Sequence, residues 1–283
     1  MQHLIRWAGG KKWFIPFFKK YTANLRYNNY FEPFAGGATI FFSCVENHHS
    51  FLSDLNSDLI DTYKVIKEKP DELIALIDRM KISETDYYYY RDDYLYETDI
   101  EKAARFLYLN HVSFNGIYRV NSEGKYNVPY GKKITPYKTE VIRVAHDRLQ
   151  NTDLAAGDFD IWKDTISEGD LVFLDPPYSV SSKKHENGFI SYNAKLFSLE
   201  DQNRLKQFID LIKERNAYYI MTNAHHEVIR TIFSNKNDIC ISLNRNCLIG
   251  GKNAKRCKVK EYIFTNIQNE FWEDEDGYLE PID

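Results

Sequence analysis

The chain has 283 residues, of which 43% are hydrophobic and 28% charged, a balance that suits a folded soluble protein and excludes disorder, collagen and a small disulfide scaffold. No stretch approaches the roughly 20 uninterrupted apolar residues of a membrane span, and Met1 is followed by polar and charged residues. We therefore expect a cytoplasmic protein with no signal segment and no membrane contact. The four cysteines stand singly, without histidines at metal-ligand spacing, which predicts reduced thiols and no bound metal.

Charge is unevenly distributed along the chain. Residues 1–31 hold six basic side chains and no acid, whereas residues 270–283 hold seven acids and no base. Without the seven acids of that tail, the formal charge of −4 becomes +3. A second basic run lies at 245–260. We expect these runs to face nucleic-acid phosphates, the alternative being that each is a solvated face.

Short apolar segments typical of buried strands alternate with helix-like ones. In chain order, strand patterns are found at 30–34, 51–54, 171–178, 218–223 and 261–266, and helix patterns at 56–67 and 199–215. Asn56 or Ser57 is expected to cap the first of these helices and Ser198 the second. This alternation predicts an α/β fold with a mostly parallel sheet. Residues 62–144 depart from it, so we expect an inserted subdomain there, within a domain made of 1–61 and 145–283 that ends in an acidic tail from about 270.

A pair of glycines follows the first predicted strand. The sequence FEPFAGGA at 31–38 runs from an apolar strand into Gly36 and Gly37, and then into a helix-like segment. Two glycines let the backbone approach a ligand that a Cβ would exclude, and the amides that open a helix face polar groups. Asp54 ends the next predicted strand, where nucleotide-binding folds place a carboxylate for ribose hydroxyls. Because the G-x-G-x-x-G pattern is absent, the pair favours a nucleoside cofactor without phosphates, with tight packing of the turn as the alternative.

The sequence LVFLDPPY at 171–178 places Asp175 at the carboxyl end of an apolar strand, the edge at which open α/β sheets bind ligands. Pro176 and Pro177 restrict the backbone, so that Asp175 and the Pro176 carbonyl can form a rigid pair of acceptors beside the flat ring of Tyr178. Two acceptors that hold the hydrogens of an exocyclic amine direct its lone pair toward an electrophile, and Tyr178 can stack on the base. The alternative is a loop stiffened by proline with an exposed Asp175.

Taken together, these motifs resemble the amino-group DNA methyltransferases that use S-adenosylmethionine, and more closely the Dam-type adenine enzymes, which form the α group of the D12 class. The blocks that carry the resemblance are RWAGGK at 6–11, EPFAGGA at 32–38, SDLNSDLI at 53–60, FLYLN at 106–110, FNGIYRVNSEGKYNVPYG at 114–131 and DPPY at 175–178. Their order, glycine turn before recognition region before DPPY, is the α arrangement. The resemblance implies a Rossmann-like methyltransferase sheet with an inserted helical target-recognition subdomain over 62–144.

The resemblance also implies S-adenosylmethionine as cofactor, with Asp54 on the ribose and Asp158 near the adenine. Ala38 stands where many members of the family have a third glycine. The residues expected to surround the cofactor are Trp7, Gly9, Gly10, Lys11, Phe34, Ala35, Gly36, Asp54, Leu55, Asp158, Phe159 and Asp175.

Residues 114–131 are expected to form a polar loop that reads DNA. Arg119 could grip a guanine with two hydrogen bonds, and Ile117 and Pro129 could touch a thymine methyl group. Asn115 or a neighbour in the loop could fill the gap left by a flipped adenine. The alternatives are a solvated arginine and turn-forming asparagines. Lys133 stands where some relatives have a tyrosine that takes part in reading DNA. The full set expected at DNA is Arg6, Asn115, Ile117, Arg119, Asn121, Pro129, Lys133, Lys255 and Arg256.

The sequence therefore predicts an enzyme that transfers a methyl group to the exocyclic amine of a flipped adenine in double-stranded DNA, at GATC or a related site. Asp175, Pro176, Pro177 and Tyr178 are the expected catalytic residues. Methylation of cytosine N4 or of RNA is the nearest alternative, and a non-catalytic DNA-binding module on the same fold is another. We expect a monomer, and the sequence leaves open whether a cognate restriction endonuclease is a partner.

Overall fold

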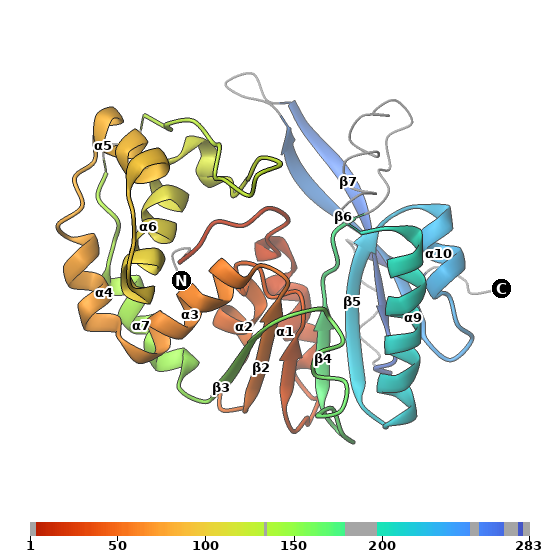
Figure 1. The fold of residues 1–283 in the computed structure, drawn as a ribbon. Helices are drawn as coiled ribbons and strands as arrows, with labels where there is room; N and C mark the ends of the chain where they lie inside the picture. The colour runs from red at the N-terminus through yellow and green to blue at the C-terminus, as the bar shows by residue number, and fades with distance from the viewer. Residues whose placement is uncertain (1–3, 133–134, 179–196, 250–254, 269–276, 280–283) are drawn as a thin grey trace. The chain divides into compact units, whose positions relative to one another are not determined.

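The computed structural model describes residues 4–132, 135–178, 197–249, 255–268 and 277–279. The chain forms two units that alternate along the sequence (Figure 1). The first comprises Met1–Lys12 and Ala35–Asp158, and the second Trp13–Phe34 and Phe159–Asp283. Residues 62–144 thus lie wholly within the first unit. Their assignment as a target-recognition subdomain, apart from 1–61 and 145–283, remains a prediction.

The first unit contains a parallel pair of strands, in which β2 (Ser50–Asp54) runs beside β3 (Thr152–Ala156). Helix α3 packs against α6 and α7, and α4 contacts all three of these helices. The helical elements of this unit are α2 (Thr39–Cys44), α3 (Ser57–Glu68), α4 (Pro70–Ile77), α5 (Glu84–Tyr88), the π-helical turn η2 (Tyr89–Asp93), α6 (Asp99–Val112), the short turn η3 (Phe114–Gly116) and α7 (Glu140–Leu149).

Local sequence signals set where these helices begin. Asn56 caps α3, as predicted, because its side chain accepts a 3.0 Å hydrogen bond from the Leu59 amide. Thr98 and Glu101 form a capping box at the start of α6, and Pro70 opens α4 at a position where its missing N–H costs nothing. The predicted helix at 56–67 is therefore confirmed almost to the residue.

The strands of the second unit lie in the order β1-β4-β5-β7-β6-β8. Strands β1, β4 and β5 are parallel, and β7, β6 and β8 join antiparallel. Helix α9 packs against β5, and α10 lies beside α9 (Figure 1). The elements are η1 (Lys12–Phe14) and α1 (Ile15–Thr22), then β1 (Tyr30–Glu32), β4 (Leu171–Leu174), α9 (Leu199–Glu214), β5 (Tyr218–Ala224), α10 (Glu227–Phe233), β6 (Ile239–Ile249), β7 (Lys255–Thr265) and β8 (Gly277–Leu279).

Aromatic packing joins α1 to the sheet of the second unit. Phe173 of β4 is fully buried, stacks on Phe14 at 5.9 Å between ring centroids and meets Phe18 edge-on at 5.8 Å. Ser198 caps α9 as predicted, and together with Asp201 it forms a capping box. The five strands and two helices expected from the sequence are all present, which confirms the α/β class.

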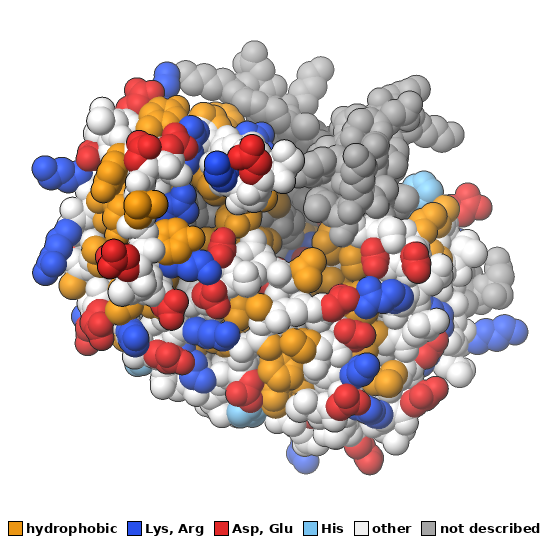
Figure 2. Space-filling view, in the orientation of Figure 1, with side chains coloured by type: hydrophobic (Ala, Val, Ile, Leu, Met, Phe, Trp, Pro, Cys, Tyr) orange, Lys and Arg blue, Asp and Glu red, His pale blue; other side chains and the backbone are white. Residues whose placement is uncertain are grey.

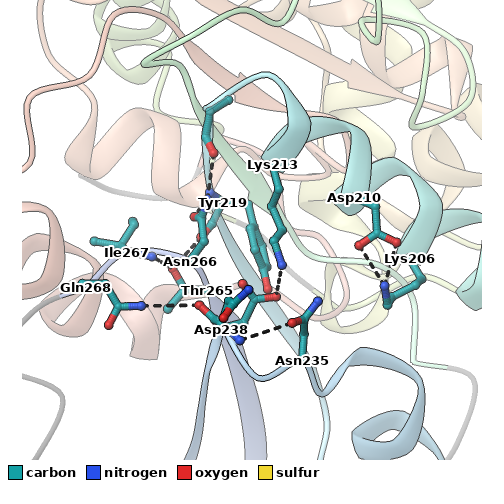
Figure 3. A network of polar contacts seen from close by, with 12 residues as sticks. Lys206, Asp210, Lys213, Tyr219, Asn235, Asp238, Thr265, Asn266, Ile267 and Gln268 are labelled. Atoms are coloured by element: carbon teal, nitrogen blue, oxygen red, sulfur yellow. Dashed lines mark hydrogen bonds and ion pairs between the residues drawn. The ribbon is translucent and has the colours of Figure 1, made fainter.

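A buried polar network anchors the amino end of β5 (Figure 3). The Lys213 ammonium of α9 donates a 2.6 Å hydrogen bond to the buried carboxylate of Asp238. Burial, with the Asp238 charge adding to it, raises the pKa of Tyr219 well above its ordinary value. The network thus fixes α9 against β5, and β5 in turn carries residues toward the site described below.

None of the helices formed by the described residues is long and apolar enough to cross a membrane.

Candidate functional site

Asp54 is the carboxylate at the end of β2. Its Oδ2 accepts a 2.9 Å hydrogen bond from the Gly36 amide, and its Oδ1 accepts one of 2.9 Å from the Asn56 amide. One side chain therefore joins the glycine turn to the start of α3. Burial raises the pKa of Asp54, and the two backbone hydrogen bonds oppose that rise because they favour the charged form.

The indole of Trp7 covers the glycine turn. Gly36 has φ of +47°, and a Cβ built there would lie 2.6 Å from Cδ1 of Trp7. The position therefore requires glycine both for its backbone conformation and for space. Ala38 has φ of +45°, a left-handed conformation that glycine adopts without strain.

The remaining cofactor candidates of the first unit differ in exposure. Lys11 is buried, and its ammonium donates a 3.0 Å hydrogen bond to the Gly9 carbonyl, so it does not belong to the exposed basic run expected over 1–31. The Leu55 side chain is 79% exposed. Asp158 is exposed and follows β3 by two residues; because β2 and β3 are parallel, it belongs to the same strand ends as Asp54. Gly10 and Ala35 complete this group, the first exposed and the second buried.

Two candidates of the second unit pack on each other. The rings of Phe34 and Phe159 stack at 5.5 Å, and Phe197 meets Phe34 edge-on at 5.8 Å. The Arg204 guanidinium lies 5.0 Å from the centroid of Phe159, over its ring. Phe159 is buried and Phe34 half-buried, so this cluster offers an apolar wall with one basic group beside it.

Asp175 follows β4 directly, between two parallel neighbours, β1 and β5. The Thr222 hydroxyl of β5 donates a 2.8 Å hydrogen bond to Oδ1 of Asp175, which orients the carboxylate. Pro176 is buried, whereas Pro177 is exposed. The structure therefore has the acidic acceptor where the sequence predicted it, at the carboxyl end of a central strand of this unit.

Tyr178 is half-buried and tied to the antiparallel part of the sheet. Its hydroxyl donates a 2.5 Å hydrogen bond to Oε2 of Glu261, a β7 side chain that is only 1% exposed. Glu261 pairs in register with Ala224 at the carboxyl end of β5. The contact limits the orientations of the Tyr178 ring, which matters for any role in stacking.

Residues 114–131 form a turn followed by a hairpin. We call residues 119–127 the recognition hairpin; its strands meet at the Val120–Tyr126 bridge. The Arg119 guanidinium donates from Nε to Oδ1 of Asn127 at 2.7 Å, and from Nη2 to the Asn127 carbonyl at 3.1 Å. Arg119 is exposed, but its direction is set by Asn127.

The other residues expected at DNA are placed as follows. Asn115 has φ of +57° in an exposed turn, and Ile117 and Pro129 are exposed. Asn121 forms the hairpin turn, since its Oδ1 accepts from the amides of Glu123 and Lys125. Lys133 lies outside the described residues. Lys255 and Arg256 belong to β7, and their side chains are not among those described.

The Arg6 backbone is fixed by Asn110 of α6. The Asn110 side chain accepts from the Arg6 amide at 2.9 Å and donates to the Arg6 carbonyl at 2.8 Å and to the Gly116 carbonyl at 3.2 Å. This side chain thus joins the segment that carries Trp7 to the turn before the recognition hairpin. On the face drawn in Figure 2, basic and acidic side chains are interspersed across the described surface, without a continuous basic patch.

Three residues of these sites escaped the sequence reasoning. Thr222 and Glu261 act through partners distant in sequence, and no motif spacing indicates such pairs. Tyr118 lay inside a quoted block, but its ring contacts, described below, depend on tertiary packing. Groups of three or more histidine, cysteine, aspartate or glutamate side chains that could hold a metal do not occur within the described part of the chain.

An α/β fold with a glycine turn, a carboxylate at the end of the next strand and a DPPY corner is that of a Rossmann-like methyltransferase. Residues 7–246 match the model of the D12 class N6 adenine-specific DNA methyltransferase family. A type II methyltransferase from Lactococcus lactis subsp. cremoris is 32% identical over 275 residues, which cover 93% of this chain and 95% of that protein. The DNA adenine methylase of Escherichia coli is 27% identical over 266 residues, covering 92% of this chain and 93% of its own. The DNA N-6-adenine-methyltransferase of Escherichia phage P1 is 32% identical over 240 residues, covering 81% of this chain but 31% of its own.

The chain belongs to the D12 class of N6 adenine-specific DNA methyltransferases. It is an enzyme that acts on adenine in DNA and needs a methyl donor. The family and activity expected from the motifs are thereby confirmed, in preference to cytosine or RNA methylation and to a non-catalytic module.

Proposed function

We propose that this enzyme transfers the methyl group of S-adenosylmethionine to N6 of an adenine that has been flipped out of a DNA duplex, at GATC or a related site. The observation that carries the proposal is the orientation of Asp175 by Thr222 at the end of β4. A carboxylate held in place before the substrate arrives is the arrangement that electrostatic catalysis requires.

The Asp175 carboxylate and the Pro176 carbonyl would accept hydrogen bonds from the two hydrogens of the adenine amine. That grip pulls the nitrogen out of the plane of the ring and directs its lone pair to one side. Pro177 restricts the backbone so that both acceptors keep their spacing. Tyr178, held by Glu261, would stack on the flipped base.

The residues around the glycine turn fit S-adenosylmethionine. Asp54 presents a fixed carboxylate that can accept from ribose hydroxyls, and Gly36, which has no Cβ, lets the Trp7 indole lie against the turn beside it. When bound, S-adenosylmethionine supplies a methyl group on a sulfonium, so the protein's task is orientation. We assign its binding to Trp7, Gly9, Gly10, Lys11, Phe34, Ala35, Gly36, Asp54, Leu55, Asp158, Phe159 and Asp175.

We assign base reading to the recognition hairpin and the turn before it. Arg119, directed by Asn127, would hydrogen-bond a guanine, while the exposed Ile117 and Pro129 would touch a thymine methyl group. Asn115 would occupy the space that the flipped adenine leaves. Asn121 shapes the turn, and Arg6, Lys133, Lys255 and Arg256 are assigned to the DNA surface, with Lys133 at an outer base.

Methylation of a set of duplexes, in which each base of GATC is changed in turn, tests this assignment. Wild type should prefer GATC, and Arg119→Ala should lose discrimination at one guanine position, worth about 1 to 3 kcal/mol. If Arg119→Ala lowers activity on every duplex by the same factor, Arg119 does not read a base. Substituting Lys255 and Arg256 together should flatten the slope of log affinity against log salt by up to about 2 while leaving sequence preference intact.

Two further assignments concern assembly. We propose that the enzyme acts as a monomer, which light scattering of the free and DNA-bound protein tests. We also propose a cognate restriction endonuclease as a partner of this enzyme, because one of its relatives is a type II methyltransferase. DNA methylated by this enzyme can be digested with endonucleases that cut at GATC-like sites. The sites that are protected from cleavage would identify the specificity that such a partner must share.

A further inference from the structure

Tyr118 lies half-buried just before the recognition hairpin, within the first unit. Its ring stacks on Trp7, with centroids 5.2 Å apart and an interplanar angle of 26°, and packs on Phe106 at 5.4 Å. The same Trp7 indole lies against Gly36. Only the Trp7 indole therefore separates one face of the Tyr118 ring from the glycine turn assigned to the cofactor.

The Tyr118 hydroxyl reaches the cofactor side by a second route. It donates a 3.3 Å hydrogen bond to Oδ2 of Asp58 and contacts the side chain of Asn56, both at the start of α3. Asp58 is itself held by the Lys102 ammonium at 2.9 Å. The Asn56 amide donates to Asp54, the residue proposed to bind the ribose. The Tyr118 hydroxyl therefore contacts the segment that positions Asp54.

Tyr118 is also packed on the DNA-reading side. The Tyr126 ring of the recognition hairpin meets it edge-on at 5.8 Å, and the Tyr126 hydroxyl donates to the Ile117 carbonyl at 2.6 Å. Arg119 follows Tyr118 directly in the chain. A shift of the Tyr118 ring would therefore move the backbone that carries Arg119.

We propose that Tyr118 couples the cofactor site to the recognition hairpin, so that each ligand binds more tightly when the other is present. The inference rests on the proposed function, because it needs Trp7 and Asp54 at the cofactor and Arg119 at a base. Two ligands that order the same packed element share the cost of ordering it, and such coupling is reciprocal. Tyr118 is a positioning residue in this account and touches neither reacting atom.

The coupling factor is the measurement that separates this role from a purely structural one. It is the ratio of the dissociation constants of S-adenosylhomocysteine, a non-reactive probe, without and with a saturating duplex that holds one GATC site. Calorimetry gives both constants for the wild type, for Tyr118→Phe, which keeps the stacked ring, and for Tyr118→Leu, which removes it. Tyr94→Leu is the matched control, because Tyr94 packs on Tyr89 and Tyr90.

In the wild type we expect a coupling factor of about 5- to 150-fold, the usual range for linked sites. Tyr118→Leu should bring it close to one, Tyr118→Phe should give an intermediate value, and Tyr94→Leu should leave it unchanged. An unchanged factor in Tyr118→Leu, or in Tyr118→Phe should the first variant fail to fold, would overturn the inference.

The same measurements distinguish failure of the inference from failure of the proposed function. A wild type that binds the probe and methylates GATC, yet has a coupling factor of one, overturns only the role of Tyr118. A wild type that does not bind the probe overturns the cofactor assignment on which that role rests. Non-additive effects of Tyr118→Phe and Asp58→Asn on the coupling factor would support the hydroxyl route, since residues in contact deviate from additivity.

Discussion

The Thr222 hydroxyl holds Oδ1 of Asp175 at 2.8 Å, so a side chain in β5 orients the carboxylate at the end of β4. Thr222→Val keeps the shape of the side chain and removes the donor. We expect kcat to fall by about tenfold, the scale of one lost hydrogen bond to a charged group, with little change in cofactor affinity.

Single-turnover methyl transfer on a saturating duplex measures this effect. Thr222→Ser keeps the hydroxyl and should retain most of the wild-type rate. Equal rates for Thr222→Val and the wild type would show that Asp175 is oriented by other groups.

The hydrogen bond between Tyr178 and Glu261 predicts a second effect on the rate. Glu261→Leu removes the acceptor that fixes the Tyr178 ring, whereas Glu261→Gln keeps an acceptor at the same place. The leucine variant should lose about tenfold in methyl transfer and the glutamine variant clearly less, because orientation of the base depends on the ring. If both variants lost the same activity, the loss would come from removal of the buried charge of Glu261 and not from removal of the acceptor for Tyr178. Thermal unfolding of each variant controls for stability.

Asp54 predicts a change in cofactor affinity. Asp54→Ala should weaken S-adenosylmethionine binding by about 1.5 to 3 kcal/mol, through lost charge-assisted hydrogen bonds, with little effect on DNA affinity measured without cofactor. Calorimetry gives both affinities. Equal affinity for S-adenosylmethionine in mutant and wild type would show that Asp54 does not bind the ribose.

The raised pKa of Asp54 adds a pH dependence to the same prediction. Because burial favours the protonated form, the stability that this carboxyl contributes is present below its ordinary pKa of 3.8 and is lost as the pH rises through the raised value. Cofactor affinity should change in the opposite direction, since ribose hydroxyls donate to the charged form. Affinity should therefore fall as the pH drops through the raised pKa, and this fall should be absent in Asp54→Ala.

The network around Asp238 predicts a loss of stability without loss of chemistry. Lys213→Met leaves the buried Asp238 carboxylate without its cation and should lower the free energy of unfolding by about 3 kcal/mol. Lys206→Met is the control, because its i,i+4 pair with Asp210 on the same helix is more exposed and should contribute below about 1 kcal/mol (Figure 3). Urea unfolding compares them, and equal losses would contradict a special role for the Asp238 pair.

Much of the fold could be predicted because local signals agree with it. Apolar runs marked β1, β2, β4, β5 and part of β7, and the caps at Asn56 and Ser198 marked the starts of α3 and α9. Strand β3 was missed because its burial is uneven and its sequence TDLAA is only partly apolar. Strand β6 was missed because the polar sequence NRN interrupts its apolar run, and it is stabilised by pairing with β7.

The candidate site was predictable where one motif carries the chemistry. The DPPY motif and the glycine pair identify Asp175 and Gly36 as site residues from local sequence alone. Lys11, in contrast, was counted with an exposed basic run but is buried, since charge patterns do not show which side chains a turn encloses. The partners of Asp175 and Tyr178 come from other strands, and only tertiary packing brings them together.

Transfer of labelled methyl groups from S-adenosylmethionine to a GATC duplex, followed by nucleoside analysis, tests the central claim most directly. The wild type should place all label in N6-methyladenine, and Asp175→Ala should lower the rate by about 10²-fold or more while the protein still binds the cofactor. Label in N4-methylcytosine, or a rate for Asp175→Ala close to that of the wild type, would contradict the account.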